Sequence, residues 1–219
     1  MARSRYRQDG TKSMCRFNIL LTAFFLGLLA SPTAAGQRAN DFPVATAAVI
    51  STEARPPMGY VGYCLRYPGE CNAHTAARAI KLDQATWALL NNVNNEVNRR
   101  IQPVTDKDHW GVAERWDLPS DGKGDCEDYA LLKRKILIEK GLNAGALLMT
   151  VVIDHEGAGH AVLTIVTDRG DYVLDNQEAA ILPWTQTGYR FVKRQSMQDP
   201  NVWATIGTPA RSPVATAAR

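Results

Sequence analysis

The sequence lacks the short motifs that define several common catalytic and binding sites. It contains neither a Cys-x-x-Cys pair nor a His-Glu-x-x-His motif, which argues against a zinc centre. Gly122 and Gly124 are not followed by the pattern of a phosphate-binding loop, which argues against a nucleotide site of that kind. We also find no internal repeat.

An excess of charge is also missing once the N-terminus is set aside. The chain has 25 Lys and Arg residues and 22 Asp and Glu residues, but five of the basic residues and one acidic residue lie in residues 1–35. The remaining 20 basic and 21 acidic residues nearly cancel. Charge therefore gives no argument for nucleic acid or an anionic membrane as a partner.

The N-terminus has no apolar run long enough for a comfortable membrane span. Basic residues precede an apolar run at residues 19–30, and Ser-Pro-Thr-Ala-Ala-Gly follows it. This order is typical of a secretory signal peptide cleaved near Ala35, so we expect a periplasmic or secreted protein. An uncleaved anchor is the alternative. Cys15 precedes the apolar run and is not placed as a lipoprotein cysteine would be.

The rest of the chain suits one domain, because 219 residues with 45% hydrophobic and 21% charged residues are ordinary for a globular core. After a signal peptide at 1–35 we expect a flexible lead-in at 36–57, with at most one early strand near 47–50. The folded domain is expected at 58–200. The Ala-, Thr- and Pro-rich tail at 201–219 is predicted to be disordered.

Cysteine is scarce, and only three cysteines follow the signal segment. Cys64 and Cys71 enclose the short segment LRYPGE, and in an oxidising compartment they are the expected disulfide. Cys126 is then left unpaired. An odd cysteine in an exported protein is an inert buried thiol, an intermolecular bridge or a reactive group, and its place at a helix start favours the last.

The order of predicted elements indicates an α+β fold, with helices first and an antiparallel sheet after them. Residues 58–71 have aromatics, glycines and the cysteine pair, and we expect an irregular loop there whose tyrosines pack against the domain. The remaining elements are predicted from apolar residues at helical or alternating spacing: helices at 83–101 and 126–140, and strands at 146–153, 160–167, 171–175 and 189–193. Within the first helix, one or two inward asparagine amides could hold a loop.

The second helix places Cys126 at its start. Asp125 is a good N-cap residue, and Gly141 a natural end to the helix. The free N–H groups of a helix start favour a thiolate, whereas the flanking acids Asp125 and Glu127 oppose it. We therefore expect a nearby imidazolium or a bound cation to offset these two carboxylates.

His160 and Asp175 are the expected partners of this thiol. A hairpin centred near Arg169 brings the start of the 160–167 strand and the end of the 171–175 strand to the same end of the sheet. A carboxylate there could orient the imidazole, which in turn could take the proton of a cysteine nucleophile. The rival bases are His74, His109 and His155. Taken singly, each residue of the set is more often structural than catalytic.

Three segments carry a resemblance to a known family. GKGDCEDYALLK, GHAVLTI and YVLDN resemble the bacterial transglutaminase-like cysteine proteinases, which include LapG-like periplasmic peptidases. VNNEVNRRI and DHWGVAERWDLPSDGKGDC are similar to upstream elements of the same family, so the likeness covers roughly residues 58–195.

The resemblance implies a papain-like or transglutaminase-like core and a cysteine peptidase with Cys126 as nucleophile, His160 as general base and acid, and Asp175 as the orienting carboxylate. It implies an oxyanion hole that includes the backbone N–H of Cys126, and a side chain from residues 110–120 is a further candidate. The chemistry itself needs no cofactor, but the resemblance implies calcium beside the cysteine, held by Asp125 and Glu127.

The partners implied by the resemblance are a protein substrate such as a cell-surface adhesin, and an inhibitory membrane receptor. No nucleic acid is expected. Two other functions remain open. One is amide transfer through the same thioester, either protein crosslinking or peptidoglycan amide chemistry, and the other is a pseudoenzyme that binds a peptide without cleaving it. A different protein target is also open, because the Cys64–Cys71 pair marks a subgroup of exported members.

Overall fold

The computed structural model describes residues 42–74 and 76–207, and the expected signal peptide lies outside them. The described residues form a seven-stranded antiparallel sheet in the order β1-β9-β8-β4-β5-β6-β7, and a short parallel pair, β2-β3. The elements are β1 (Ile50–Ala54), α1 (Met58–Arg66), η1 (Pro68–Cys71), α2 (Gln84–Arg100), β2 (Gln102–Pro103), α3 (Asp106–Trp110), β3 (Lys123–Gly124), α4 (Cys126–Glu139), η2 (Ala144–Ala146), β4 (Leu147–Ile153), β5 (Gly159–Thr167), β6 (Gly170–Leu174), β7 (Leu182–Pro183), η3 (Trp184–Gln186), β8 (Arg190–Gln195) and β9 (Trp203–Ile206). The α+β prediction is therefore confirmed.

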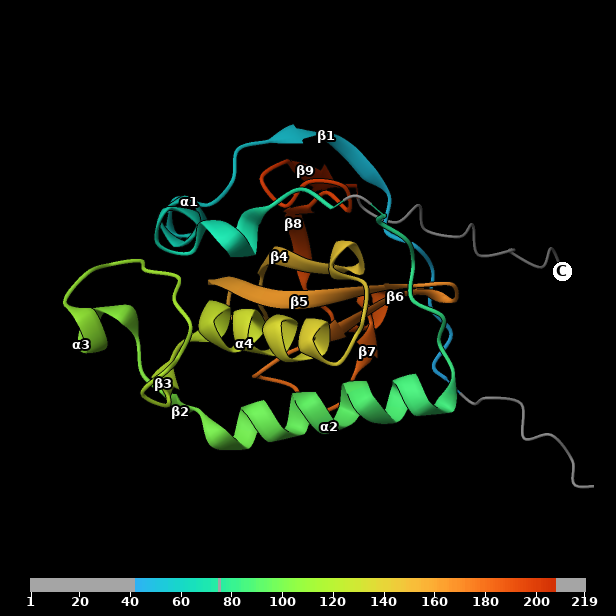
Figure 1. Cartoon of the computed structure of the whole chain (residues 1–219), viewed down its shortest axis with the longest axis horizontal. Helices are drawn as coiled ribbons and strands as arrows, with labels where there is room; N and C mark the ends of the chain where they lie inside the picture. The colour runs from blue at the N-terminus through green and yellow to red at the C-terminus, as the bar shows by residue number, and fades with distance from the viewer. Residues whose placement is uncertain (1–41, 75, 208–219) are drawn as a thin grey trace, which may run out of the picture. The chain divides into compact units, whose positions relative to one another are not determined.

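Helix α4 packs between β5 and α2, as Figure 1 shows. Alternate residues of the central strands face opposite sides of the sheet, so two apolar clusters form. Leu163 and Leu131 belong to the cluster on the helix side, and Val162 and Trp184 belong to the cluster on the other side. Because both faces of β5 are covered, this strand reads as a nearly continuous apolar run.

The predicted helices have the expected ends. The Asp83 side chain accepts a hydrogen bond from the Thr86 N–H at 2.8 Å and caps α2. Gly141, directly after the C-cap of α4, has a φ of 91°, which a residue with a side chain rarely adopts. No helix among the described residues is long and apolar enough to cross a membrane.

The segment at 58–71 differs from the prediction, because it forms α1 and η1 instead of an irregular loop. Its glycines suggested a loop, but Gly59 is required by a close approach: a Cβ there would collide with the indole of Trp116. Tyr60 and Tyr63 are buried, as expected for packing against the domain. The disulfide between Cys64 and Cys71 is present.

Both ends of the domain also differ from the prediction. The early strand lies at 50–54 instead of 47–50 and pairs with β9, so part of the expected lead-in belongs to the sheet. Residues 203–206, predicted as disordered tail, form β9 between β1 and β8. Trp203 is fully buried, which explains why the chain remains packed beyond residue 200.

Candidate active site

Cys126 is the first residue of α4, and Asp125 is its N-cap. The Asp125 side chain makes no capping hydrogen bond; instead its Oδ2 accepts from the Asp106 N–H at 3.1 Å. Gly124 lies against Asp128, and a Cβ at position 124 would come within 2.5 Å of Asp128 Oδ2. The turn before Cys126 therefore needs glycine at 124 because an acidic side chain occupies the space.

The Cys126 thiol lies between a donor and an acceptor. Its Sγ accepts from the Ala161 N–H at 3.4 Å, and the thiol donates to Glu127 Oε2 at 3.3 Å. Burial is the largest effect and raises the pKa of the Cys126 thiol well above its usual range; the Glu127 charge raises it further, while the Ala161 N–H lowers it. Burial and the flanking acid thus outweigh the Ala161 N–H, and the opposition from Glu127 is the one expected from the sequence.

His160 and Asp175 lie together at one end of the β5-β6 hairpin. Leu163 pairs with Leu174, so His160 and Asp175 come to the same end. Nε2 of His160 is 2.8 Å from Asp175 Oδ1, and both side chains are buried. Burial opposes ionisation of Asp175, but the hydrogen bond and charge of His160 hold the pKa of this carboxyl below its usual value.

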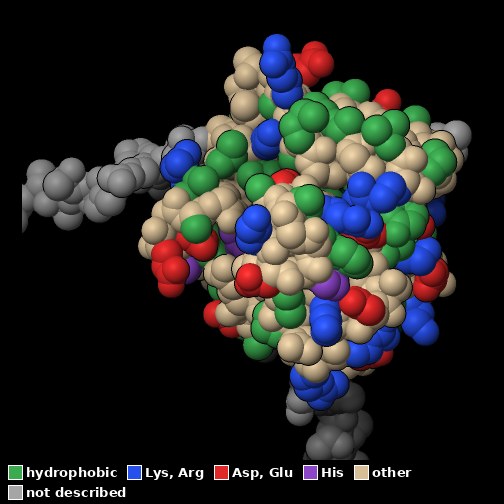
Figure 2. Space-filling model, turned by 90° about the vertical axis from the view of Figure 1, so that its left-hand side faces the viewer, with side chains coloured by type: hydrophobic (Ala, Val, Ile, Leu, Met, Phe, Trp, Pro, Cys, Tyr) green, Lys and Arg blue, Asp and Glu red, His purple; other side chains and the backbone are tan. Residues whose placement is uncertain are grey.

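The thiol and the imidazole line the same cleft, which has a volume of about 210 Å³. The cleft is lined by Pro57, Glu114, Trp116, Cys126, Glu127, Val151, Gly159, His160, Ala161 and Lys193. Figure 2 shows the face of the molecule that lies on the left of Figure 1, where basic and acidic side chains are interspersed.

The three rival histidines do not line this cleft. His155 is exposed and borders a different cavity. Nε2 of His109 is 2.8 Å from Asp121 Oδ2. His74 is half-buried, and its backbone N–H donates to the Gln198 carbonyl at 2.7 Å. Of the four histidines in the sequence, only His160 is placed beside the thiol.

Two asparagine amides of α2 hold the loop that follows β6. Asn98 Nδ2 donates to the Asp175 carbonyl at 2.8 Å, and Asn94 Nδ2 donates to the Ala179 carbonyl at 3.1 Å. These are the inward amides anticipated from the sequence. They fix the backbone at Asp175 and so support the position of its carboxylate.

An acidic cluster lies beside the thiol. Ligand atoms of Asp106, Glu114 and Glu127 lie within 4.8 Å of one another, as do those of Asp106, Asp125 and Asp128. Within the described part of the chain, Asp125 Oδ1 and Glu127 Oε1 are buried without a hydrogen-bond partner. Each group of three therefore includes one acid with an unpartnered buried oxygen, which fits a cation.

The electrostatics of the cluster support the same reading. Burial, followed by the neighbouring Asp125 carboxylate, raises the pKa of Glu127 to about 10. Burial is also the largest cause that raises the pKa of Asp128 to about 8. Glu127 and Asp128 are therefore held where their charge is disfavoured, and a cation would offset that effect.

Sequence reasoning named Asp125 and Glu127 for this site but missed Asp106, Glu114 and Asp128. Asp128 could have been found, because it follows in the same helical turn as Glu127. Asp106 and Glu114 come from the loop before the helix and are brought in only by folding.

Cys126 begins a helix, a buried His–Asp pair lies at one end of the β5-β6 hairpin, and the thiol and imidazole share a cleft. These features define a thiol hydrolase with a transglutaminase-like α+β fold. The sequence model of the bacterial transglutaminase-like cysteine proteinases matches residues 50–211. The chain belongs to this family of cysteine peptidases.

Similar solved structures include calcium-bound LapG of Legionella pneumophila, which is 25% identical with a TM-score of 0.48 over 58% of this chain and 74% of that chain. A second LapG structure from the same organism is 24% identical with a TM-score of 0.47 over 57% of this chain and 70% of that chain. The comparison with curated proteins found no match.

Proposed function

We propose that this protein is an exported cysteine peptidase that hydrolyses a peptide bond in a protein substrate through a thioester on Cys126. One observation carries the proposal: Cys126 and His160 line one cleft, and a buried carboxylate, Asp175, is hydrogen-bonded to the imidazole at 2.8 Å. This is the nucleophile, base and orienting group that acyl transfer by a thiol requires.

The hydrogen bond to Asp175 assigns the two ring nitrogens of His160. With Nε2 committed to the carboxylate, Nδ1 is the nitrogen left to exchange a proton with the thiol. The sulfur then attacks the scissile carbonyl carbon, the C–N bond breaks, and His160 gives its proton to the leaving amine. Water attacks the thioester next; His160 takes a proton from it, and the acid product leaves as Cys126 is regenerated.

The oxyanion is stabilised in this proposal by the backbone N–H of Cys126, which lies at a helix start where N–H groups have no partner in the helix. Trp116, from the loop at 110–120 that the sequence marked for a second donor, lines the same cleft. Its Nε1 already donates to Glu114 Oε1 at 2.5 Å, so in this structure the indole N–H is committed to that carboxylate.

Calcium is the cation proposed for the acidic cluster. Its ligands would come from one of the two groups that share Asp106, either Asp106, Glu114 and Glu127 or Asp106, Asp125 and Asp128, which offer the oxygen ligands that calcium prefers. When bound, the ion supplies positive charge beside the cysteine and offsets its acidic neighbours.

The place of action and the partners follow from the sequence. Export through the signal peptide would bring the enzyme to the periplasm or outside the cell, where a cell-surface adhesin is the proposed substrate. The proposed regulator is an inhibitory membrane receptor. Both partners rest on the family resemblance of the sequence.

Alkylation of Cys126 tests the catalytic pair without a known substrate. We expect iodoacetamide to label the mature, calcium-loaded protein rapidly and the His160→Ala variant roughly 100-fold more slowly, which is the lower range of general-base effects. His74→Ala is the matched control, because this histidine lines a separate cavity outside the catalytic cleft, and should label at the wild-type rate. Equal slow labelling of all three proteins would contradict the proposal and favour a binding module.

Incubation with casein and a fluorescent primary amine distinguishes the reactions that share the thioester. We expect new peptide N-termini that depend on Cys126 and no amine incorporated into casein. Amine incorporation without cleavage would favour amide transfer.

A further inference from the structure

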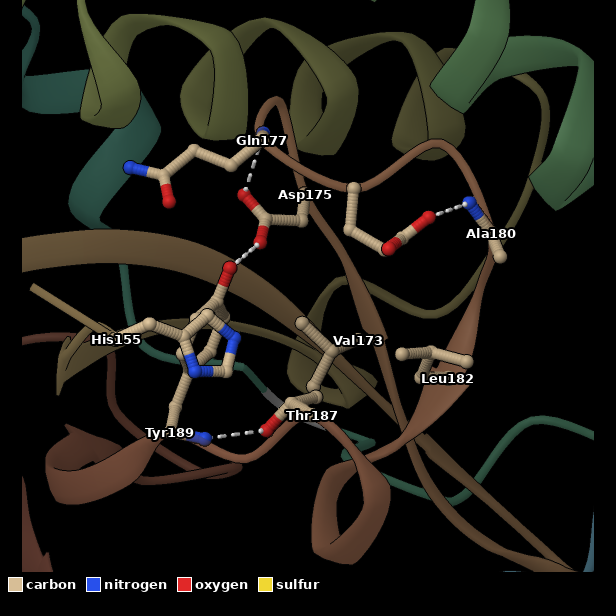
Figure 3. A pocket seen from close by; sticks show the side chains of 9 residues that line it. His155, Val173, Asp175, Gln177, Ala180, Leu182, Thr187 and Tyr189 are labelled. Atoms are coloured by element: carbon tan, nitrogen blue, oxygen red, sulfur yellow. Dashed lines mark hydrogen bonds between the residues drawn. The ribbon is translucent and has the colours of Figure 1, made fainter.

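Tyr189 makes a hydrogen bond to the orienting carboxylate that the sequence did not indicate. It precedes β8, and its Oη donates to Asp175 Oδ2 at 2.6 Å. Figure 3 shows this hydroxyl pointing at Asp175 from the side of a second cavity, which has a volume of about 120 Å³. Tyr189 is therefore in contact with the catalytic carboxylate without lining the catalytic cleft.

The hydroxyl completes a set of three donors around Asp175. His160 Nε2 and the Gln177 N–H both lie on Oδ1, at 2.8 and 3.1 Å, whereas Tyr189 lies on Oδ2. Hydrogen bonds to one oxygen leave a carboxylate able to turn about its Cβ–Cγ bond. A donor on the second oxygen fixes its plane, and with it the direction from which the imidazole is held.

Tyr189 is itself held firmly by its neighbours. Its ring centroid is 4.9 Å from that of His155 and 5.7 Å from that of His160, with the second pair edge to face. Its backbone N–H donates to Thr187 Oγ1 at 3.2 Å. Gly188 has a φ of 74°, and a Cβ there would come within 2.6 Å of His155 Cε1. The turn at Gly188 thus sets the position of the Tyr189 ring beside His155 and His160.

We infer that Tyr189 is a positioning residue for the reaction, acting through Asp175 on His160. The inference rests on the proposed function, since it assigns Tyr189 to the same catalytic set. Tyr189 would thus join Cys126, His160 and Asp175. Its hydroxyl holds the plane of the Asp175 carboxylate, and its ring packs edge to face with the His160 imidazole.

The Tyr189→Phe variant tests this inference, because it removes the hydroxyl and keeps the ring. Tyr172→Phe is the matched control: Tyr172 is buried and its hydroxyl donates to the Pro43 carbonyl at 2.7 Å, away from the catalytic set. We expect Tyr189→Phe to label with iodoacetamide about tenfold more slowly, the effect of one lost hydrogen bond to a charged group. Tyr172→Phe should label at the wild-type rate.

A spectroscopic readout separates positioning from general destabilisation. The ring N–H proton that His160 shares with Asp175 should appear at low field in the proton NMR spectrum. We expect this resonance to shift or broaden in Tyr189→Phe and to stay unchanged in Tyr172→Phe. Melting curves of both variants give the extent of any loss of stability.

The Asp175→Ala background tests whether Tyr189 acts through the carboxylate. There, Tyr189→Phe should cause no further slowing, because the group it positions is gone. A further slowing in that background would overturn the inference, as would wild-type labelling and an unchanged resonance in Tyr189→Phe alone. His160→Ala separates a failure of this inference from a failure of the proposed function: if this variant labels like wild type, the proposed function itself fails.

Discussion

Replacing Glu127 by glutamine should stabilise the calcium-free protein. Burial raises the pKa of Glu127 from 4.5 to about 10, so the folded protein keeps a proton on this carboxyl at pH 7 whereas the unfolded chain loses it. The folded state therefore binds more protons between those two pKa values, and its stability falls as the pH rises through this window. Glutamine has nearly the same shape as glutamic acid and does not ionise.

The gain in stability depends on how far the pH lies above the pKa of Glu127 in the unfolded chain. At pH 7 this gain is about 3 kcal/mol of unfolding free energy, and it changes by about 1.4 kcal/mol per pH unit. The unfolding free energy of Glu127→Gln should therefore be higher than that of wild type by about 2 kcal/mol at pH 6 and by about 5 kcal/mol at pH 8 in a chelating buffer.

Urea unfolding at pH 6, 7 and 8 measures the difference. Glu139→Gln is the matched control: Glu139 is an exposed acid on the same helix, paired with Lys135 at 3.3 Å, and should change stability by less than about 0.5 kcal/mol. Calcium should stabilise wild type more than Glu127→Gln, because the variant lacks one proposed ligand. A difference that is absent or independent of pH would refute the reasoning.

Three further predictions concern other parts of the molecule. Replacing both Cys64 and Cys71 by alanine should lower the unfolding free energy by roughly 2–3 kcal/mol in urea titrations, because the seven-residue separation closes a short loop; an unchanged midpoint would contradict this. Trp203→Ala should cost about 3–5 kcal/mol, since the indole is fully buried and packs edge to face on Tyr60 at 5.4 Å; a loss below about 1 kcal/mol would show that β9 is not packed as described. Burial lowers the pKa of Lys133 from 10.5 to about 7, so between these two pKa values the unfolded chain binds more protons than the folded protein. Lys133→Met should therefore raise the unfolding free energy by about 4 kcal/mol at pH 7 but by only about 2 kcal/mol at pH 9. Urea unfolding at these two pH values should show the smaller gain at pH 9.

The sequence predicted the parts of the site that depend on local structure. Asp125 stands at the N-cap of α4 as predicted, although its side chain makes no capping hydrogen bond, and Gly141 ends the helix through a preference that acts within one helix. The β5-β6 hairpin is equally local, because its short turn fixes the register that brings His160 and Asp175 to one end. These short-range rules were enough to indicate that His160 and Asp175 would meet; Cys126 joins them only because α4 packs on β5.

Contacts between distant segments escaped sequence reasoning for physical reasons. Strand β1 is almost entirely exposed, so it has no alternation of apolar residues, and it becomes a strand only through its hydrogen bonds to β9, some 150 residues later. Residues 58–71 looked like a loop because the indole that Gly59 accommodates lies far along the chain.

By itself the sequence determined the fold class, the helix that begins at Cys126 and the hairpin that carries the His–Asp pair, because neighbouring residues encode helix ends, turns and strand register. Only the tertiary structure decided the environment of these groups. It buried the Cys126 thiol beside Glu127, joined Asp106 to the acids of α4, and placed Tyr189 on the free oxygen of Asp175. Burial and distance between remote segments govern pKa values and hydrogen bonds, and neither is written in a local pattern.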